Sequence, residues 1–311
     1  MASITKVALA GATGNLGPSI LKGLLDAGFQ VTVLTRQSST HSFPANVNVS
    51  KVDYESLDSL TSALQGQDAV VSTLASLALG TQLLLIDAAV KAGVKRFIPS
   101  EFGSNTINEK ARQLPVYKDK LAVQAALQKE ADAGRISYTL VLNGPFLDWG
   151  LKVGFVGNVP EKKFDLWDGG ERVFSATSLP SVGKATANIL KHPEETKNRA
   201  VYIQDTAITL KQLLAVCKKA AGEDGWTIND GSTEEMYNNA WAELKKEQPN
   251  HMVFVFGFLK TGVWGEGYGS HYEKTDNELL GLKDLSEAEL EQLVANVARP
   301  GEAKTTDGAF Y

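Results

Sequence analysis

The sequence predicts an α/β protein built on a doubly wound parallel sheet. Three observations lead to this prediction. Short apolar stretches alternate with stretches of helical periodicity through the first 150 residues, the short stretches are apolar almost without interruption, and a glycine-rich segment follows the first of them. Strands that are covered by helices on both faces lack polar alternation, so this pattern favours parallel strands connected by helices.

The elements of this first half follow from local composition, taken in chain order. KVALAG begins the series as a short apolar run. The apolar residues from Ile20 to Leu25 have helical spacing, Gly28 ends that helix, and the β-branched run QVTVLTR then favours a strand. Continued in this way, the predicted strands cover 6–11, 30–36, 47–53, 68–75, 96–100 and 137–143, and the predicted helices cover 18–28, 57–64, 81–92 and 117–133.

The pattern changes after Pro145. Two runs that favour strands lie on either side of Asp168-Gly169-Gly170, and they predict a β-hairpin within residues 164–175. Helical spacing predicts a helix over residues 181–190. The apolar run 200–204 then predicts a further strand of the main sheet.

The last third of the chain contains two helix starts and many aromatic residues. Thr209 with Gln212, and Ser286 with Glu289, have the spacing of capping boxes. The helices that these boxes predict cover residues 210–221 and 287–297. The aromatic residues between them are Trp226, Tyr237, Trp241, Phe254, Phe256, Phe258, Trp264 and Tyr268. We interpret this part as a smaller lobe that closes over a ligand, although packing in a core would also explain most of these side chains.

Composition limits the class of protein. The 311 residues are 43% hydrophobic, which suffices for one large domain or two coupled lobes. The net charge of −5 argues against nucleic acid as a partner. The lone Cys217 excludes an intrachain disulfide, and four scattered histidines argue against a metal site. Neither a signal peptide nor an apolar run of about 18 residues is present, so we expect a cytoplasmic protein without a membrane partner.

The segment GATGNLG, between the first strand and the first helix, has the spacing of a dinucleotide-binding turn. Gly11 allows the tight turn, Gly14 lets the backbone approach a diphosphate, and Gly17 lets the helix pack closely on the strand. Backbone N–H groups at the start of the helix would hold the phosphates. The predicted phosphate-binding residues are Gly11, Thr13, Gly14, Asn15, Leu16 and Gly17. A plain turn between strand and helix is the alternative.

The end of the second strand indicates which cofactor binds. Arg36 stands where an NAD-preferring site has an acidic residue, and its guanidinium suits the 2′-phosphate of NADP(H). Ser38 is placed to donate a further hydrogen bond, and Asp53 is placed to accept one from the adenine amino group. The alternatives are a solvated charge for Arg36 and a helix cap for Asp53. Residues 1–150 are therefore predicted to form a Rossmann-like NADP-binding domain. Residues 151–311 are predicted to form a smaller mixed α/β substrate lobe, from which 176–204 returns to the first domain.

Several segments of the chain have a distinctive sequence. They are GATGNLG, Arg36, VVSTLA (70–75), KRFIPSEFG (95–103), the helix of Lys120 and NGPFLDWGL (143–151). Together they resemble the NmrA-like and isoflavone reductase-like family of atypical short-chain dehydrogenases/reductases, and NGPFLDWGL resembles its fungal branch. The resemblance covers the whole chain and is strongest over residues 1–150. The usual Tyr-x-x-x-Lys pair of short-chain dehydrogenases is absent, because Lys120 follows Tyr117 by three positions.

The resemblance implies an NADPH-dependent reductase of a small aromatic, enone or quinone-like substrate. Lys120 would be the acid/base or electrostatic catalyst, whereas Lys118 points from another face of the helix; both could instead be surface charges. The cofactor would contact Thr73, Ser100, Phe102, Lys120, Asn143 and Phe146, and the substrate would contact Phe102, Phe146 and Trp149, with Asn143 contributing to the same wall. Core packing is the alternative for Trp149.

Two other functions fit the same residues. An NmrA-like regulator would bind NADP(H) without turnover, and a protein with a vestigial site would have neither role. We expect a monomer or a weak homodimer.

Overall fold

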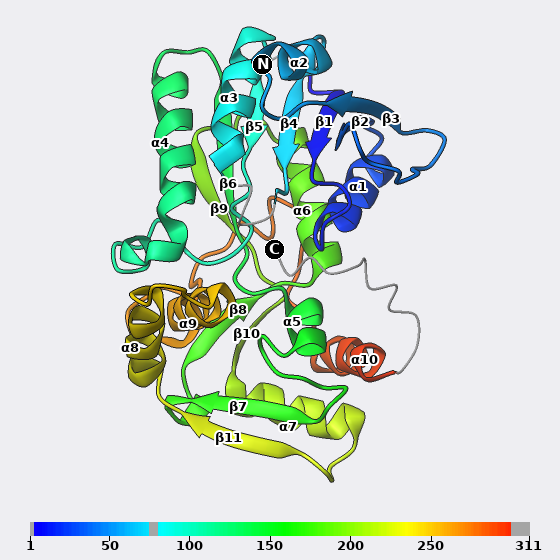
Figure 1. Cartoon of the computed structure of the whole chain (residues 1–311). Helices are drawn as coiled ribbons and strands as arrows, with labels where there is room; N and C mark the ends of the chain where they lie inside the picture. The colour runs from blue at the N-terminus through cyan, green and yellow to red at the C-terminus, as the bar shows by residue number, and fades with distance from the viewer. Residues whose placement is uncertain (1–2, 75–79, 300–311) are drawn as a thin grey trace.

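The computed structural model describes residues 3–74 and 80–299, in which a central sheet with its helices lies above a smaller group of elements (Figure 1). The central sheet has seven strands in the order β3-β2-β1-β4-β5-β6-β9, and every neighbouring pair is parallel. The strands are β1 (Lys6–Ala10), β2 (Gln30–Arg36), β3 (Asn48–Val52), β4 (Ala69–Ser72), β5 (Arg96–Ile98), β6 (Ser137–Leu142) and β9 (Arg199–Tyr202). The predicted doubly wound parallel sheet is confirmed, and β9 is its predicted extra strand. Ala75, at the end of the predicted fourth strand, lies outside the described residues, as does the segment 300–311 of the predicted second lobe.

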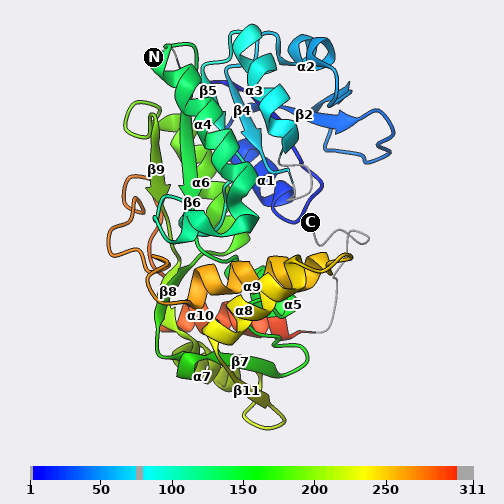
Figure 2. The same ribbon diagram turned by 60° about the vertical axis from the view of Figure 1, so that its left-hand side comes forward.

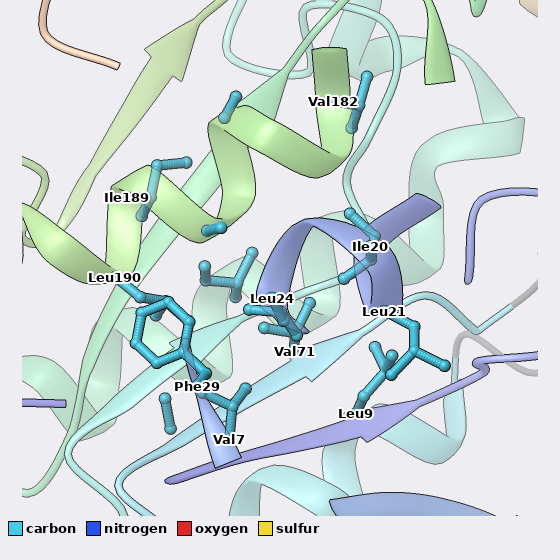
Figure 3. Packing of buried hydrophobic residues seen from close by; sticks show 14 of the residues in the cluster. Val7, Leu9, Ile20, Leu21, Leu24, Phe29, Val71, Val182, Ile189 and Leu190 are labelled. Atoms are coloured by element: carbon cyan, nitrogen blue, oxygen red, sulfur yellow. The ribbon is translucent and has the colours of Figure 1, made fainter. Parts of the chain in front are cut away.

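Helices cover both faces of this sheet. The covering helices are α1 (Gly17–Asp26), α2 (Leu57–Leu64), α3 (Gln82–Lys91), α4 (Lys118–Asp132) and α6 (Leu179–Lys191). Figure 3 shows Ile20 and Leu24 of α1 in one continuous apolar cluster with Val182 and Leu190 of α6 and with Val71 of β4. On the other face α2, α3 and α4 bury a second cluster that includes Leu60 and Leu127. The helices α1 and α6 cross so closely at Gly23 that a Cβ there would lie only 2.4 Å from the carbonyl oxygen of Gly183.

The second group of elements contains two small sheets and five helices among the residues that the structure describes. Its strands are β7 (Lys163–Trp167), β8 (Val173–Ala176), β10 (Thr206–Thr209) and β11 (Thr227–Gly231), and its helices are α5 (Leu147–Val153), α7 (Leu210–Ala221), α8 (Thr233–Leu244), α9 (His251–Trp264) and α10 (Glu287–Ala298). Both predicted capping boxes are present, at the starts of α7 and α10. Figure 2 shows α8 and α9 side by side, between the central sheet above and the β7–β11 pair below.

The predicted hairpin over residues 164–175 is wrong. Its two runs do form β7 and β8, but β7 pairs in parallel with β11 and β8 pairs antiparallel with β10. The reason lies in the connection, a 3₁₀ turn at Asp168–Gly170 in which Asp168 itself has a φ of 48°. The Asp168 carboxylate accepts hydrogen bonds from the backbone N–H and the hydroxyl of Thr233, which ties the turn to the start of α8 instead of closing a hairpin.

The core alternative holds fully for three of the eight aromatic residues, Phe258, Trp264 and Tyr268, which are buried, whereas the other five are partly exposed. Trp264 and Phe258 are buried, and Trp264 packs edge-on against Phe174 with 5.7 Å between ring centroids.

No helix in the described ranges is long and apolar enough to cross a membrane.

Candidate active site

The glycine-rich turn between β1 and α1 is shaped by two glycines that the chain itself requires. Gly11 has a φ of 83°, and a Cβ there would lie 2.6 Å from the carbonyl oxygen of Thr73. A Cβ on Gly17 would lie 2.3 Å from the carbonyl oxygen of Gly11. Any side chain at either position would displace backbone, so both glycines are explained by the fold alone.

Gly14 differs from these two glycines. A Cβ there would meet nothing closer than the Gly11 carbonyl oxygen, at the ordinary contact distance of 3.5 Å. The chain therefore has room for a side chain at Gly14 but leaves its backbone bare and exposed. Bare backbone of this kind suits the close approach of a diphosphate.

The start of α1 is open to an anion. The residue before it, Leu16, makes no side-chain cap, and the first turn contains Pro18 and no acidic residue. The N–H groups of Ser19 and Ile20 donate to the Leu16 carbonyl oxygen, so an anion at this end of the helix would meet the N–H of Gly17 and the positive end of the helix dipole. Asn15 is exposed and Thr13 is partly exposed, so both side chains are available as donors. Leu16 is buried in the core, so only its backbone can contribute to such a site.

The ends of β2 and β3 bring the predicted 2′-phosphate and adenine residues together. Arg36 pairs in register with Val52, so Asp53 follows directly beside it. Arg36 and Ser38 are exposed, and no carboxylate in the described ranges forms an ion pair with Arg36. Asp53 does not cap α2; its carboxylate accepts the backbone N–H of Glu55 at 2.9 Å, and Ser56 is the cap. The helix-cap alternative for Asp53 is therefore wrong.

Thr73 and Ser100 follow the ends of β4 and β5, at the same edge of the sheet. The Thr73 hydroxyl donates to the carbonyl oxygens of Ala10 and Gly11, both at 2.9 Å. The Ser100 hydroxyl donates to the carbonyl oxygen of Leu74 at 2.8 Å. Both hydroxyls thus fix the backbone of this edge, and Thr73 acts directly beneath the glycine turn.

The PSEFG segment, residues 99–103, brings Lys120 to this edge. Phe102 is buried and has a φ of 33°, a left-handed conformation that is costly for a phenylalanine and is typical of functional sites. On α4 the Lys120 ammonium donates a hydrogen bond to the carbonyl oxygen of Glu101. It also lies 5.8 Å from the ring centroid of Tyr117.

Lys120 is only partly exposed, whereas Lys118 is exposed on another side of α4. Burial lowers the pKa of Lys120 below its ordinary value, and the negative charge of Glu101 opposes that change. Tyr117 is fully buried, and burial raises the pKa of its phenol, so Tyr117 remains neutral beside the ammonium. The geometry therefore gives Lys120 the features of an acid or an electrostatic catalyst.

The remaining predicted residues lie after β6. Asn143 is fully buried; its amide nitrogen donates to the carbonyl oxygen of Gly144 at 2.7 Å, and its Oδ1 has no hydrogen-bond partner among the residues described. Phe146 packs against the cluster that contains Phe102, and its ring meets that of Trp149 edge-on at 6.4 Å. Trp149 also lines a groove of about 810 Å³ between α5, the start of α6 and α10. Neither Lys120 nor Phe146 lines that groove.

Sequence reasoning missed three contributors to this site: the Glu101 carboxylate, Gln124 and the Tyr117 ring. The one available signal was that Gln124 lies one helical turn after Lys120 and so shares its face of α4. Within residues 3–74 and 80–299 there is no group of His, Cys, Asp and Glu side chains that could hold a metal ion.

Comparisons with known proteins identify the family and the fold. The model of the NmrA-like family matches residues 4–263. The chain is 36% identical over 286 residues to "Oxidoreductase aprR" of Aspergillus flavus, covering 89% of this chain and 94% of that protein. It is 30% identical over 237 residues to "Phenylcoumaran benzylic ether reductase PT1" of Pinus taeda, covering 70% and 76% respectively. The solved complex of leucoanthocyanidin reductase with NADPH from Vitis vinifera superposes with a TM-score of 0.76 at 18% identity, covering 94% of this chain and 99% of that one.

Proposed function

Because the chain belongs to the NmrA-like family, we propose that it is an NADPH-dependent reductase of a small aromatic, enone or quinone-like substrate. The single observation that carries this proposal is the position of Lys120. Its partly buried ammonium lies next to the edge of the parallel sheet at which the strands end, the edge that also has the glycine turn after β1. That edge is where doubly wound sheets bind their ligands. The names of the relatives, an oxidoreductase and a benzylic ether reductase, support the same class of reaction.

The residues at this edge fit a dinucleotide with a 2′-phosphate. The bare backbone at Gly14 and the uncapped start of α1 would hold the diphosphate. Arg36, which lacks an acidic partner in the described ranges, would pair with the 2′-phosphate, and Ser38 would donate to it. Asp53 would accept from the adenine amino group through the carboxylate oxygen that the N–H of Glu55 leaves free. When bound, NADPH supplies a hydride.

Lys120 would stabilise the substrate oxygen that becomes negative and would donate a proton to it. One N–H of its ammonium is held by the Glu101 carbonyl, which fixes the direction of the remaining two. Because burial lowers the pKa of Lys120, this ammonium is a stronger acid than an ordinary lysine. Phe102 and Phe146 would supply an apolar wall for a flat substrate, and Trp149 would extend that wall through its ring contact with Phe146.

The test is turnover by the purified protein with NADPH and a panel of quinones and aromatic enones, followed by nicotinamide absorbance. Lys120→Met is expected to lower kcat by at least about a hundredfold, within the usual range for a general acid, while the matched variant Lys118→Met keeps full activity. Cofactor binding without oxidation by any acceptor would contradict the reductase and favour the regulatory alternative. We also propose a cytoplasmic monomer or weak homodimer; the single, buried Cys217 is compatible with a reducing compartment.

A further inference from the structure

A buried carboxylate lies next to Lys120, and the proposed reaction does not use it directly. Glu101 follows β5 in the PSEFG segment and is only 2% exposed. Its backbone carbonyl accepts the hydrogen bond from the Lys120 ammonium. Its side chain lies among groups from α4 and from the loop before that helix. An ionised side chain at such depth is unfavourable unless neighbouring groups compensate for the lost water.

The compensation comes from two neutral donors. The Thr106 hydroxyl donates to Oε2 of Glu101 at 2.8 Å, and the Gln124 amide donates to Oε1 at 2.9 Å. The same amide also lies 2.9 Å from the Thr106 hydroxyl, so the three side chains form a closed cluster. No lysine, arginine or histidine in the described part of the chain is within ion-pair distance of this carboxylate. Its charge is therefore available to act through space on the Lys120 ammonium, which the backbone carbonyl of the same residue binds.

We propose that Glu101 is a positioning residue for Lys120: its carbonyl oxygen orients the ammonium, and its buried carboxylate favours the charged form of that ammonium. The effect on turnover rests on the proposed function. The effect on the charge of Lys120 does not, because it follows from this cluster alone.

The other groups around Lys120 do not provide this charge. Tyr117, from the 3₁₀ turn before α4, is neutral because burial raises the pKa of its phenol, and the same holds for Tyr268 and Tyr272 behind it. On α4 itself, Lys118 and Asp119 are exposed to solvent. The helix α9 packs against Tyr117 through Gly262, and its charged Lys260 faces Asp165 at 3.7 Å instead. Glu101 is thus the acidic group whose charge opposes the effect of burial on the pKa of Lys120.

The test removes the negative charge of the Glu101 side chain and keeps the shape of that side chain. In Glu101→Gln the new amide can still bond Thr106 and Gln124, because each of these side chains can both donate and accept. The measurement is the titration of the Lys120 side chain by NMR on lysine-labelled protein, with its signal assigned by its absence in Lys120→Arg. We expect Glu101→Gln to lower the pKa of Lys120 by about one unit, the low end of the range for one close opposite charge. Glu101→Asp, which keeps the charge, should retain most of the wild-type value.

A matched control perturbs the same cluster without removing the charge. Gln124→Met deletes one donor to Glu101 and should leave the titration of Lys120 within about a third of a unit of wild type. A downward shift of half a unit or more in Glu101→Gln alone supports the proposal. A smaller or upward shift overturns it, as does an equal shift in Gln124→Met. In turnover assays of Glu101→Gln, the pH at which kcat falls on the alkaline side of the pH profile should move down together with the NMR titration of Lys120. If the titration moves but no acceptor is reduced, the reductase assignment fails and the role of Glu101 in the charge state stands.

Discussion

Adding one methyl group to Gly14 or to Gly17 should separate binding from folding. At Gly17 the new Cβ would lie 2.3 Å from one backbone oxygen and 2.4 Å from the backbone carbon of Ala12, so the turn would have to shift. Overpacking of this kind costs about 1–3 kcal/mol, and because the clash here is with backbone atoms we expect a cost in the upper part of that range, above the roughly 1 kcal/mol that alanine gains over glycine in a helix. We therefore expect Gly17→Ala to lower the free energy of unfolding.

At Gly14 the same methyl group meets only an ordinary contact at 3.5 Å, and the backbone there is not left-handed. Loss of chain entropy in the unfolded state should make Gly14→Ala neutral or more stable by about 0.4–1 kcal/mol. The methyl would, however, stand where a diphosphate approaches the backbone. We expect NADPH affinity to fall at least tenfold, which is about 1.4 kcal/mol.

The assays are urea unfolding monitored by circular dichroism, and NADPH titration monitored by protein fluorescence, on both variants and wild type. Wild-type NADPH affinity in Gly14→Ala would refute the assignment of Gly14 to the cofactor. Wild-type stability in Gly17→Ala would refute the steric argument for the turn.

Three further predictions concern charge and stability. Arg36→Asp should lower NADPH affinity at least about tenfold and leave NADH affinity within a few-fold, because only the 2′-phosphate loses a charged partner; equal losses for the two cofactors in equilibrium titrations would contradict this. Burial, with a smaller contribution from the charge of Asp205, raises the folded-state pKa of Asp148, although N–H groups including that of Leu179 oppose the change. Its contribution to stability is therefore full below the unfolded pKa of about 3.9 and is lost as pH rises through the higher folded pKa; Asp148→Asn should remove this component from urea unfolding measured across pH, and an unchanged pH slope would contradict it. Arg96 is fully buried and donates to three hydroxyls and one backbone carbonyl, so Arg96→Met should lower the free energy of unfolding by about 3 kcal/mol, and a loss below about 1 kcal/mol would show that these bonds are replaceable.

Much of the fold could be predicted because its signals are local. The strand β2 has the predicted bounds because its β-branched residues form an uninterrupted run, and α7 and α10 begin where the capping boxes place them. The hairpin failed because pairing in the second group is not local: the partner of β7 is β11, about 60 residues later in the chain. The helix α9 gave no helical signal, because apolar residues lie on all of its sides.

The candidate site also has a part that local sequence signals predict and a part that depends on contacts between distant segments. The glycine turn and Arg36 could be predicted because each depends on one short segment after one strand. The cluster of Glu101, Thr106 and Gln124 could not, since it forms only when the loop after β5 packs against α4. The groove beside Trp149 likewise exists only because α10 returns to lie next to α5, and no pattern in the sequence indicates that contact.

The most direct test of the central claim is isothermal titration calorimetry of the unmodified protein with NADPH and, separately, with NADH. A cofactor held by bare backbone at Gly14 and by Arg36 should bind, and NADPH should bind at least about ten times more tightly than NADH. The absence of any binding heat with NADPH, or equal affinity for the two cofactors, would contradict the cofactor assignment and remove the hydride source on which the role of Lys120 depends.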